Sequence, residues 1–470
     1  MIDNHTTIIH RLGSNEAEQR SYYRLLHNDR LNHRDIQELL YAECCSQVEA
    51  GHHYLVLQDT TQINLERNRK NISDMEGLGV IADHATLGFY LHPSLVIDAG
   101  SGRCLGYSHI EQWYHQADAP KKSAENNKKR AIESKESYRW LRSADASYAR
   151  LTKAANKQTT AQTTAQTTAI QPIRMTIVSD RESDIYQFYA RRAGHQAMYN
   201  LLIRWNVNRR LENGQKLFDE LSSVVASGCY TIQVRSNLRK NIIGRQVEVE
   251  VRYRRVSLTP PLTFTSTEEC DRHPVELWAI EAREVTLKPE GALKSEGALK
   301  SSAVSSKPIL WRLLTTHSIE SCEQALACIR WYEERWHIEQ AFRLLKHEGF
   351  NIEESDLETG KGVITMTLLS MGAIAKILTL YVCAKTSVLE PIGRFLSQQE
   401  QACLRVLCKQ YQGRTSRQKN PYPADTIQWC SWILARLAGW KPHEKHIGVI
   451  TLFRGWQRFC DILQGFQLSG

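Results

Sequence analysis

The chain has 470 residues, of which 42 % are hydrophobic, and a formal net charge of +9 from 60 Lys and Arg against 51 Asp and Glu. This length favours one elaborated domain or two to three domains, and the mild positive charge suits a polyanionic partner. The 12 cysteines include no Cys-x2-Cys pair, which argues against a zinc ribbon and a dense disulfide framework. The N-terminus has no apolar core of signal-peptide length, and no window approaches about 18 uninterrupted apolar residues, so we expect a soluble, cytoplasmic protein without a membrane partner.

Residues 1–48 are predicted to form a short helical N-terminal region, from the segments NEAEQRSYYRLLHND and HRDIQELLYAECCSQVEA. Its arginines either contact DNA phosphates or form a solvated helix face. Two of them, Arg20 and Arg24, lie in the first segment, and Arg30 and Arg34 follow.

The first candidate acid follows a short apolar strand predicted over Tyr54–Gln58. Asp59 ends this strand, where a carboxylate is held rigidly with its head in a cleft; the alternative is an aspartate that caps a turn. Two more strands, LHPSLVIDA and RCLGYSHIEQWY, are joined by the hairpin turn AGSGR. We therefore expect three successive antiparallel strands with Asp59 on the first.

Charged and repetitive segments come next. The basic run from Lys121 to Arg130 is expected to be an exposed loop that leads into a helix around KESYRWLRSADASYARLTK. Residues 157–169, KQTTAQTTAQTTA, are small and polar and are expected to be a flexible insertion, as is the later repeat of EGALKS.

The second candidate acid ends a strand predicted over Met175–Ser179. Asp180 is followed by Arg181, and a helix is expected to begin with Glu182 and Asp184 in its first turn, stabilised by the helix dipole. The segment MYNLLIRWNVNRRL predicts a further strand, which carries Arg204 toward the presumed cleft.

Residues 212–312 predict a large all-β insertion, because CYTIQVRSN, RQVEVEVRYRRVSL, VELWAIEAREV and ILWRLLTT alternate with a period of two. Trp311 lies on the last of these strands. It is either a core side chain or an exposed aromatic that stacks on an unpaired base, a contact worth about 1–3 kcal/mol.

The third candidate acid lies in WYEERWHIEQAFRLLKHEGF, Trp331–Phe350, which is rich in helix formers and predicts one helix. At about 100° per residue, Tyr332, Arg335, Glu339 and Lys346 fall within an arc of roughly 60°. The neighbouring apolar face suits packing on a sheet. The alternative is an ordinary amphipathic helix with charged residues at its boundary.

The spacing Tyr-x2-Arg-x3-Glu-x6-Lys, together with the Asp-Arg-Glu segment at Asp180, resembles the signature of DDE transposases of bacterial insertion sequences, specifically the insertion-sequence-four family. This resemblance implies an α/β fold with a ribonuclease-H-like mixed sheet, a β insertion before the last catalytic helix, and helical ends. The domains would be 1–48, which is shortened relative to the family and contacts DNA, 49–370, the catalytic domain with its insertion, and 371–470, a helical region for subunit contact.

The resemblance also implies that Asp59, Asp180 and Glu339 are the catalytic, metal-binding triad. Three carboxylates in one cleft repel each other, and all-oxygen ligation selects Mg²⁺, for which Mn²⁺ may substitute. The DNA-binding residues would be Tyr332, Arg335, Lys346, Trp311, Arg204 and Arg181.

The implied activity is cut-and-paste transposition by a homodimer on double-stranded DNA, in the bacterial cytoplasm at the nucleoid. Two alternatives remain open. One is a ribonuclease-H-like nuclease or resolvase without transfer activity. The other is a catalytically silent DNA-binding or dimerising inhibitor derived from a transposase.

Overall fold

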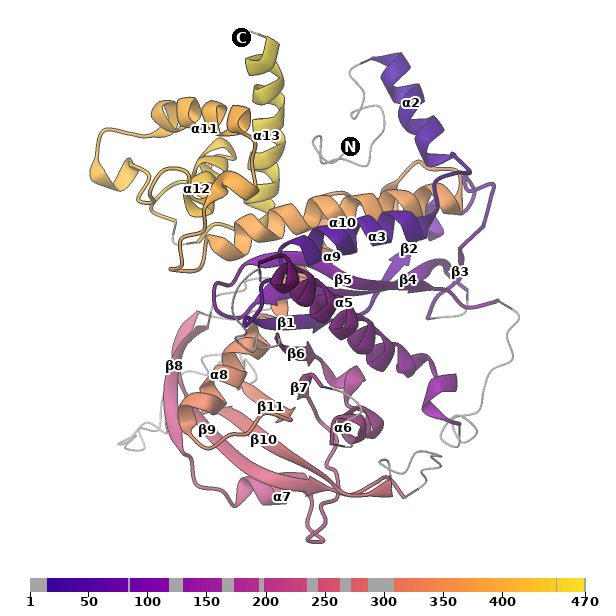
Figure 1. The fold of residues 1–470 in the computed structure, drawn as a ribbon, viewed down its shortest axis with the longest axis vertical. Helices are drawn as coiled ribbons and strands as arrows, with labels where there is room; N and C mark the ends of the chain where they lie inside the picture. The colour runs from indigo at the N-terminus through magenta and orange to yellow at the C-terminus, as the bar shows by residue number, and fades with distance from the viewer. Residues whose placement is uncertain are drawn as a thin grey trace, which may run out of the picture. The chain divides into compact units, whose positions relative to one another are not determined.

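The computed structural model describes residues 15–82, 85–117, 130–162, 173–193, 198–234, 244–262, 272–285, 308–444 and 446–468. The chain divides into two compact units. Unit 1 comprises Met1–Lys122, Arg139–Met175 and Arg335–Gly470, and unit 2 comprises Ser123–Tyr138 and Thr176–Glu334. Both units combine strands with flanking helices, so the predicted α/β class is confirmed (Figure 1).

The strands of unit 1 are organised around β4 (Leu87–Asp98), whose 12 residues are all buried. The flanking strands β1 (His53–Gln58), β2 (Thr61–Asn64), β3 (Gly79–Val80) and β5 (Cys104–Trp113) all pair with β4 in the antiparallel sense. The three strands expected here correspond to β1, β4 and β5, and their antiparallel pairing is confirmed. They are not successive, because β2 and β3 lie between β1 and β4 in the sequence, and Asp59 follows β1 instead of lying on it.

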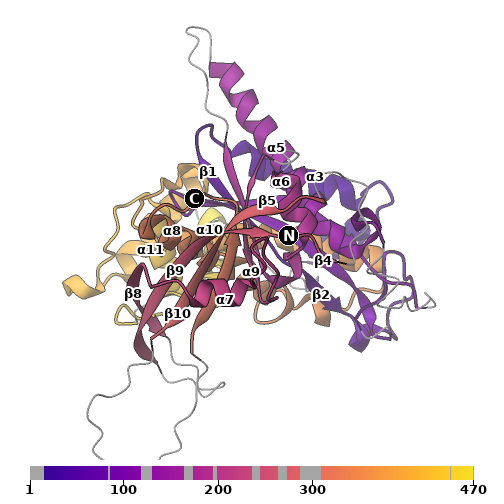
Figure 2. The same cartoon turned by 90° about the horizontal axis from the view of Figure 1, so that it is seen from below.

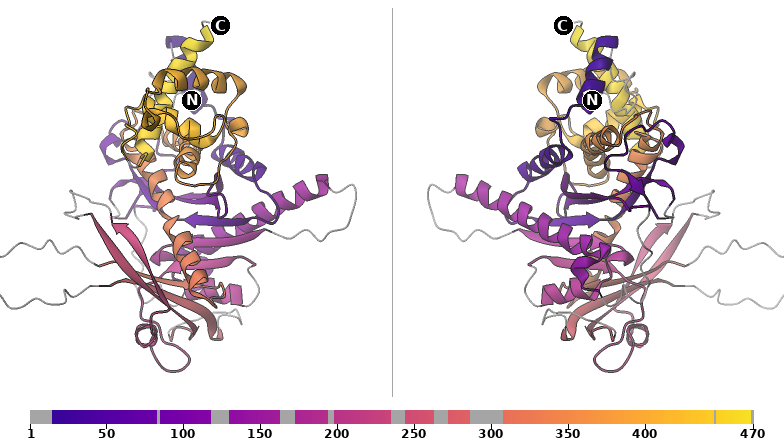
Figure 3. Two further views of the ribbon diagram at one scale, coloured as in Figure 1. Left: turned by 90° about the vertical axis from the view of Figure 1, so that its left-hand side faces the viewer. Right: turned by 90° about the vertical axis from the view of Figure 1, so that its right-hand side faces the viewer.

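Three helices are fixed to β5 by buried polar contacts. The Tyr41 hydroxyl of α3 (His33–Ser46) donates to the Ile110 carbonyl at 3.2 Å, and Thr379 of α10 (Gly360–Cys383) donates to the Cys104 carbonyl at 3.0 Å. Ser108 donates to Ser147 of α5 (Arg139–Gln162) at 2.9 Å. The far end of α5 extends away from the strands of unit 1 (Figure 3).

The other helices of unit 1 are α2 (Glu16–Leu26), α9 (Trp336–Lys346), α11 (Gln398–Tyr411), α12 (Ile427–Leu437) and α13 (Val449–Leu468). Gly455 allows α13 to approach α12 closely, because a Cβ atom there would lie 1.9 Å from the Leu434 carbonyl oxygen. The aromatic side chains Trp429, Trp432, Phe453, Trp456 and Phe459 are buried, so packing is one role of this region.

The expected boundary at residues 370/371 falls inside α10, which runs without interruption from Gly360 to Cys383. Among the described residues, α10 alone is long and apolar enough to cross a membrane, and 78 % of its most apolar window is buried inside the protein. This burial is consistent with a core helix of a soluble protein.

Unit 2 contains a mixed sheet. The strands β6 (Arg174–Ser179, of which Thr176 onward belongs to unit 2) and β7 (Asn200–Arg204) are parallel, and every other pair in this sheet is antiparallel. The order is β6, β7, β11 (Leu310–Thr315), β10 (Val275–Glu284), β9 (Arg245–Leu258) and β8 (Gly228–Val234). Figure 2 shows β8, β9 and β10 running side by side.

The strands β8, β9 and β10 and the start of β11 lie in the stretch 212–312, and their alternating sequences account for their strand structure. The expectation that this stretch is all-β is wrong at residues 217–222, which form a helix. The helices of unit 2 are α6 (Tyr186–Ala193), α7 (Leu217–Ser222) and α8 (Cys322–Glu333). Arg254 of β9 donates to Glu220 of α7 at 3.0 Å, which fixes that helix to the sheet.

Several sequence expectations fall outside the described residues. The basic run lies there except for Arg130, and so does the repeat of EGALKS. For the repeat at 157–169 the structure gives only its beginning, where α5 continues as a helix to Gln162. The expectation of a flexible insertion is therefore wrong for residues 157–162.

Candidate active site

The stretch predicted as one helix over Trp331–Phe350 is interrupted. The helix α8 ends at Glu333, and α9 begins at Trp336 and ends at Lys346. Glu334 and Arg335 connect them with helical backbone angles, and the division between the two units falls between these residues. Gly349 ends the segment where a Cβ atom would lie 2.3 Å from the Leu344 carbonyl oxygen.

The structure brings two of the three candidate acids together in unit 1. Arg335 donates from Nη1 to Asp59 Oδ2 at 2.9 Å, and its Nη2 forms an ion pair with Glu339 Oε1. Asp59 and Arg335 are 276 positions apart in the sequence. Since the Asp59 and Glu339 side chains are 24 % and 31 % exposed, two carboxylates and one cation share a partly desolvated, accessible site.

Asp59 lies at a break in the sheet. The pairing register of β1 with β4 continues into β2, so Asp59 and Thr60 face Pro93 and His92 across the gap. Proline has no N–H group to donate to a ladder, which explains why the pairing is interrupted there. The backbone N–H of Thr60 donates to Asp59 Oδ1 at 2.8 Å and fixes the carboxylate.

Buried His92 holds the residue next to Asp59. His92 Nδ1 lies 2.9 Å from the Thr60 hydroxyl oxygen, which also accepts a bond from Arg139 Nε at 3.2 Å. The His92 ring packs edge-on against Trp140 and is fully buried. Burial, and then the charge of Arg139, lower the pKa of His92 from 6.5 to about 3. The imidazole is therefore neutral at physiological pH.

We expect His92 to make the folded protein sensitive to acid. In the unfolded chain the imidazole binds a proton below its pKa of 6.5, whereas the folded state resists protonation until about pH 3. Stability is therefore present above 6.5 and is lost as pH falls toward 3, by up to about 1.4 kcal/mol per pH unit. Urea unfolding at pH 7, 6 and 5 gives the free energy of unfolding at each pH. This free energy should fall less steeply with falling pH for His92→Gln than for the wild type.

The change His443→Gln, at an exposed histidine, is the matched control for the substitution itself. Equal slopes for His92→Gln and the wild type would remove His92 as a source of this pH dependence.

Lys346 ties α9 to the strand that follows Asp59. Its Nζ donates to the Gln62 carbonyl at 2.8 Å and lies 3.2 Å from Glu353, which accepts from the Asn64 N–H at 2.9 Å. Both ends of α9 thus hold the β1–β2 segment, Arg335 at Asp59 and Lys346 at Gln62. The helix α9 packs on α10 and α13, so the expectation that its apolar face packs mainly on a sheet is wrong.

The remaining acid, Asp180, lies in unit 2 directly after β6 and accepts a bond from the Arg181 N–H at 2.8 Å. The strands β6 and β7 are parallel and pair Ser179 with Ile203. Asp180 and Arg204, each next in sequence to one of these paired residues, therefore lie at the same edge of this sheet.

The expectation that Asp184 belongs to the first turn of a helix is wrong. Asp184 follows a short 3-10 turn over Arg181–Ser183, and α6 begins only at Tyr186. Its buried carboxylate pairs with Arg209 at 2.8 Å, and burial raises its pKa. This ion pair fixes the turn that follows Asp180, a role for Arg209 that the sequence did not reveal.

Three aromatic side chains, two of them candidate residues, differ in their exposure to solvent. Trp311 on β11 is half-buried and Tyr332 on α8 is buried, both in unit 2. Trp336, the first residue of α9, is 54 % exposed next to Arg335 in unit 1. Trp336 was not among the candidate residues predicted from the sequence. Its position directly after Arg335 could have indicated an aromatic side chain close to the candidate acids.

The oxygen atoms of Asp59 and Glu339 suit a hard divalent cation, since both carboxylates converge on one guanidinium. Within the described ranges, no group of three or more His, Cys, Asp or Glu side chains is arranged to hold a metal ion. Asp59 and Glu339 supply two carboxylates in unit 1 and do not by themselves form such a group.

No family model matches this chain. The assignment of a function therefore depends on the residues and their geometry.

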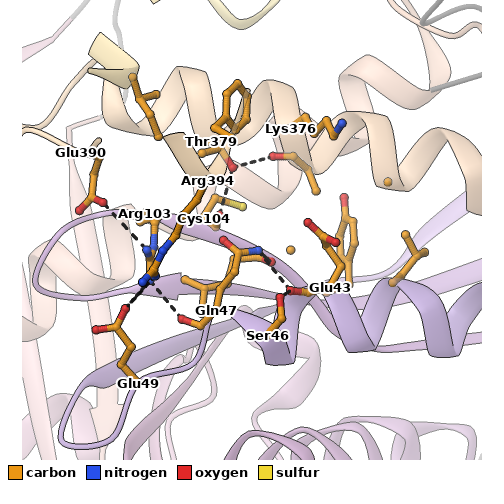
Figure 4. A pocket seen from close by; sticks show the side chains of 18 of the residues that line it. Glu43, Ser46, Gln47, Glu49, Arg103, Cys104, Lys376, Thr379, Glu390 and Arg394 are labelled. Carbon is orange, nitrogen blue, oxygen red and sulfur yellow. Dashed lines mark hydrogen bonds and ion pairs between the residues drawn. The ribbon is translucent and has the colours of Figure 1, made fainter. Parts of the chain in front are cut away.

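A separate hollow of about 1420 Å³ lies in unit 1 among α3, β5, α10 and the segment that follows α10. In it Arg103 donates to the Gln47 carbonyl at 3.1 Å and faces Glu49 at 3.6 Å and Glu390 at 4.0 Å (Figure 4). None of the candidate active-site residues lines this hollow.

Proposed function

We propose that this protein is a DNA transposase that moves an insertion sequence by metal-dependent phosphodiester hydrolysis and strand transfer. The observation that carries the proposal is the convergence of Asp59 and Glu339 on Arg335, because two signature residues meet a predicted triad acid although 276 positions separate Asp59 from Arg335. The proposal includes a ribonuclease-H-like arrangement, Asp180 as the third carboxylate, and action in the bacterial cytoplasm.

The proposed chemistry requires Mg²⁺ or Mn²⁺ held by Asp59, Asp180 and Glu339. These carboxylates would hold the ions, which would supply activation of a water or a 3′-hydroxyl and stabilisation of the leaving oxygen in an in-line displacement. The Thr60 N–H and the Thr60–His92 bond orient the Asp59 carboxylate, and α9 presents Glu339 one helical turn beyond Arg335.

The proposed partner is double-stranded DNA, bound by a homodimer. The net charge of +9 supports a polyanionic partner. Arg181 and Arg204 lie beside Asp180 on unit 2, and we assign them to phosphate contacts together with Arg335 and Lys346. Tyr332 is assigned to a phosphate contact as well, although its side chain is buried in unit 2. Trp311 is the candidate for a contact with an unpaired base, and the exposed Trp336 is a further candidate.

The test is cleavage of a plasmid that carries the DNA ends flanking this reading frame, with Mg²⁺ or with EDTA. We expect double-strand breaks that require Mg²⁺ and that disappear in Asp59→Asn, because an amide replaces the charged ligand. DNA binding without any cutting by the wild type would favour a silent inhibitor. Cutting that persists in Asp59→Asn would exclude Asp59 from the active site.

A further inference from the structure

The Arg335 guanidinium occupies the oxygen atoms that the proposed chemistry needs. It contacts Asp59 Oδ2 through Nη1 at 2.9 Å and Glu339 Oε1 through Nη2. The Arg335 side chain is only 11 % exposed. Because a planar guanidinium binds two acceptors at once in a partly desolvated site, this arrangement is stronger than a surface ion pair.

Both oxygen atoms of Asp59 already accept a hydrogen bond in this arrangement. Its Oδ1 accepts from the Thr60 N–H at 2.8 Å and its Oδ2 accepts from Arg335. A divalent cation bound to Oδ2 would stand next to the guanidinium, and the two positive charges would repel each other. A cation and Arg335 therefore compete for the same carboxylates.

We propose that Arg335 is an internal competitor of the divalent cation and leaves the two carboxylates when a DNA phosphate binds its guanidinium. This inference rests on the proposed function, because it assumes a cation site at Asp59 and Glu339. Its consequence is that DNA and the cation each strengthen the binding of the other, by the same factor. If Arg335 holds the carboxylates about 90 % of the time, cation binding is weakened about tenfold.

The experiment titrates the full-length protein with Mn²⁺ and follows free Mn²⁺ by electron paramagnetic resonance, without DNA and without any cleavage. Wild type is compared with Arg335→Gln, which removes the positive charge of the guanidinium but retains a polar side chain. We expect Arg335→Gln to bind Mn²⁺ about tenfold more tightly. Addition of the DNA end should tighten Mn²⁺ binding by the wild type and have little effect on the variant, after subtraction of Mn²⁺ bound by the DNA alone.

Two further variants keep the result decisive. Arg335→Lys retains the charge, but a single ammonium lacks the fork that reaches both carboxylates. We expect Arg335→Lys to bind Mn²⁺ more tightly than the wild type and less tightly than Arg335→Gln. The comparison of Arg335→Lys with the wild type still tests the competition if Arg335→Gln folds poorly. Asp59→Asn reports on the cation site itself.

If Asp59→Asn weakens Mn²⁺ binding while neither Arg335 variant strengthens it, the competition is excluded and the proposed function stands. If Asp59→Asn binds Mn²⁺ like the wild type, the cation site is wrong, and the proposed function fails with it.

Discussion

Glu339→Gln is expected to reduce DNA cleavage by at least about a thousandfold, because several kcal/mol of transition-state stabilisation depend on a charged metal ligand. The amide has the same shape as the carboxylate, so α9 should remain folded. DNA affinity should change little, since the substitution removes a negative charge and leaves Arg335 in place. The measurement is single-turnover cleavage with Mg²⁺, alongside DNA binding measured by fluorescence anisotropy.

The matched control is Glu348→Gln. Glu348 follows α9 in the sequence and forms an exposed ion pair with Arg343 at 3.1 Å. This variant should cut DNA at the wild-type rate. Full activity in Glu339→Gln would remove Glu339 from the catalytic centre.

Glu281→Ala is expected to destabilise the protein by about 3–5 kcal/mol. This is the usual cost of removing one partner of a buried ion pair, because the other charge stays buried without compensation. The Glu281 side chain on β10 is 2 % exposed and is surrounded by three arginines. Its Oε2 accepts from Arg312 at 2.8 Å, and its Oε1 lies 2.8 Å from Arg283 and 3.8 Å from Arg252. Removal of the carboxylate leaves three guanidinium groups close together, and urea unfolding measures the loss.

Glu276→Ala is the matched control on the same strand. Glu276 pairs with Arg255, and both side chains are more than half exposed, so its loss should cost less than about 1 kcal/mol. Equal effects of the two substitutions would show that the Glu281 cluster adds no more stability than a surface ion pair.

The sequence predicted those parts of the fold that depend on local pattern. The apolar run before Asp59 and the one before Asp180 predicted β1 and β6, and the alternation in RQVEVEVRYRRVSL predicted β9. Such patterns report which side chains must be buried, and burial decides strand structure.

Tertiary partners were not predictable in the same way. The interruption at Glu334 and Arg335 has no Gly or Pro to mark it, and both residues are good helix formers. Asp184 was assigned to a helix start, but its ion pair with Arg209, 25 positions later, fixes it in a turn. Asp59, Glu339 and Arg335 were identified individually, whereas the contacts of Arg335 with the two carboxylates depend on the folded chain.

The interruption opposite Pro93 combines a fixed framework of strands with local freedom at Asp59. The strands β1 and β2 remain attached to the long, buried β4, so the framework on either side of Asp59 is rigid. Between them, Asp59 and Thr60 belong to neither ladder and are held mainly by side-chain bonds. Small adjustments of the Asp59 carboxylate therefore need no change in strand pairing, and the chain can exchange partners at Asp59 without loosening its core.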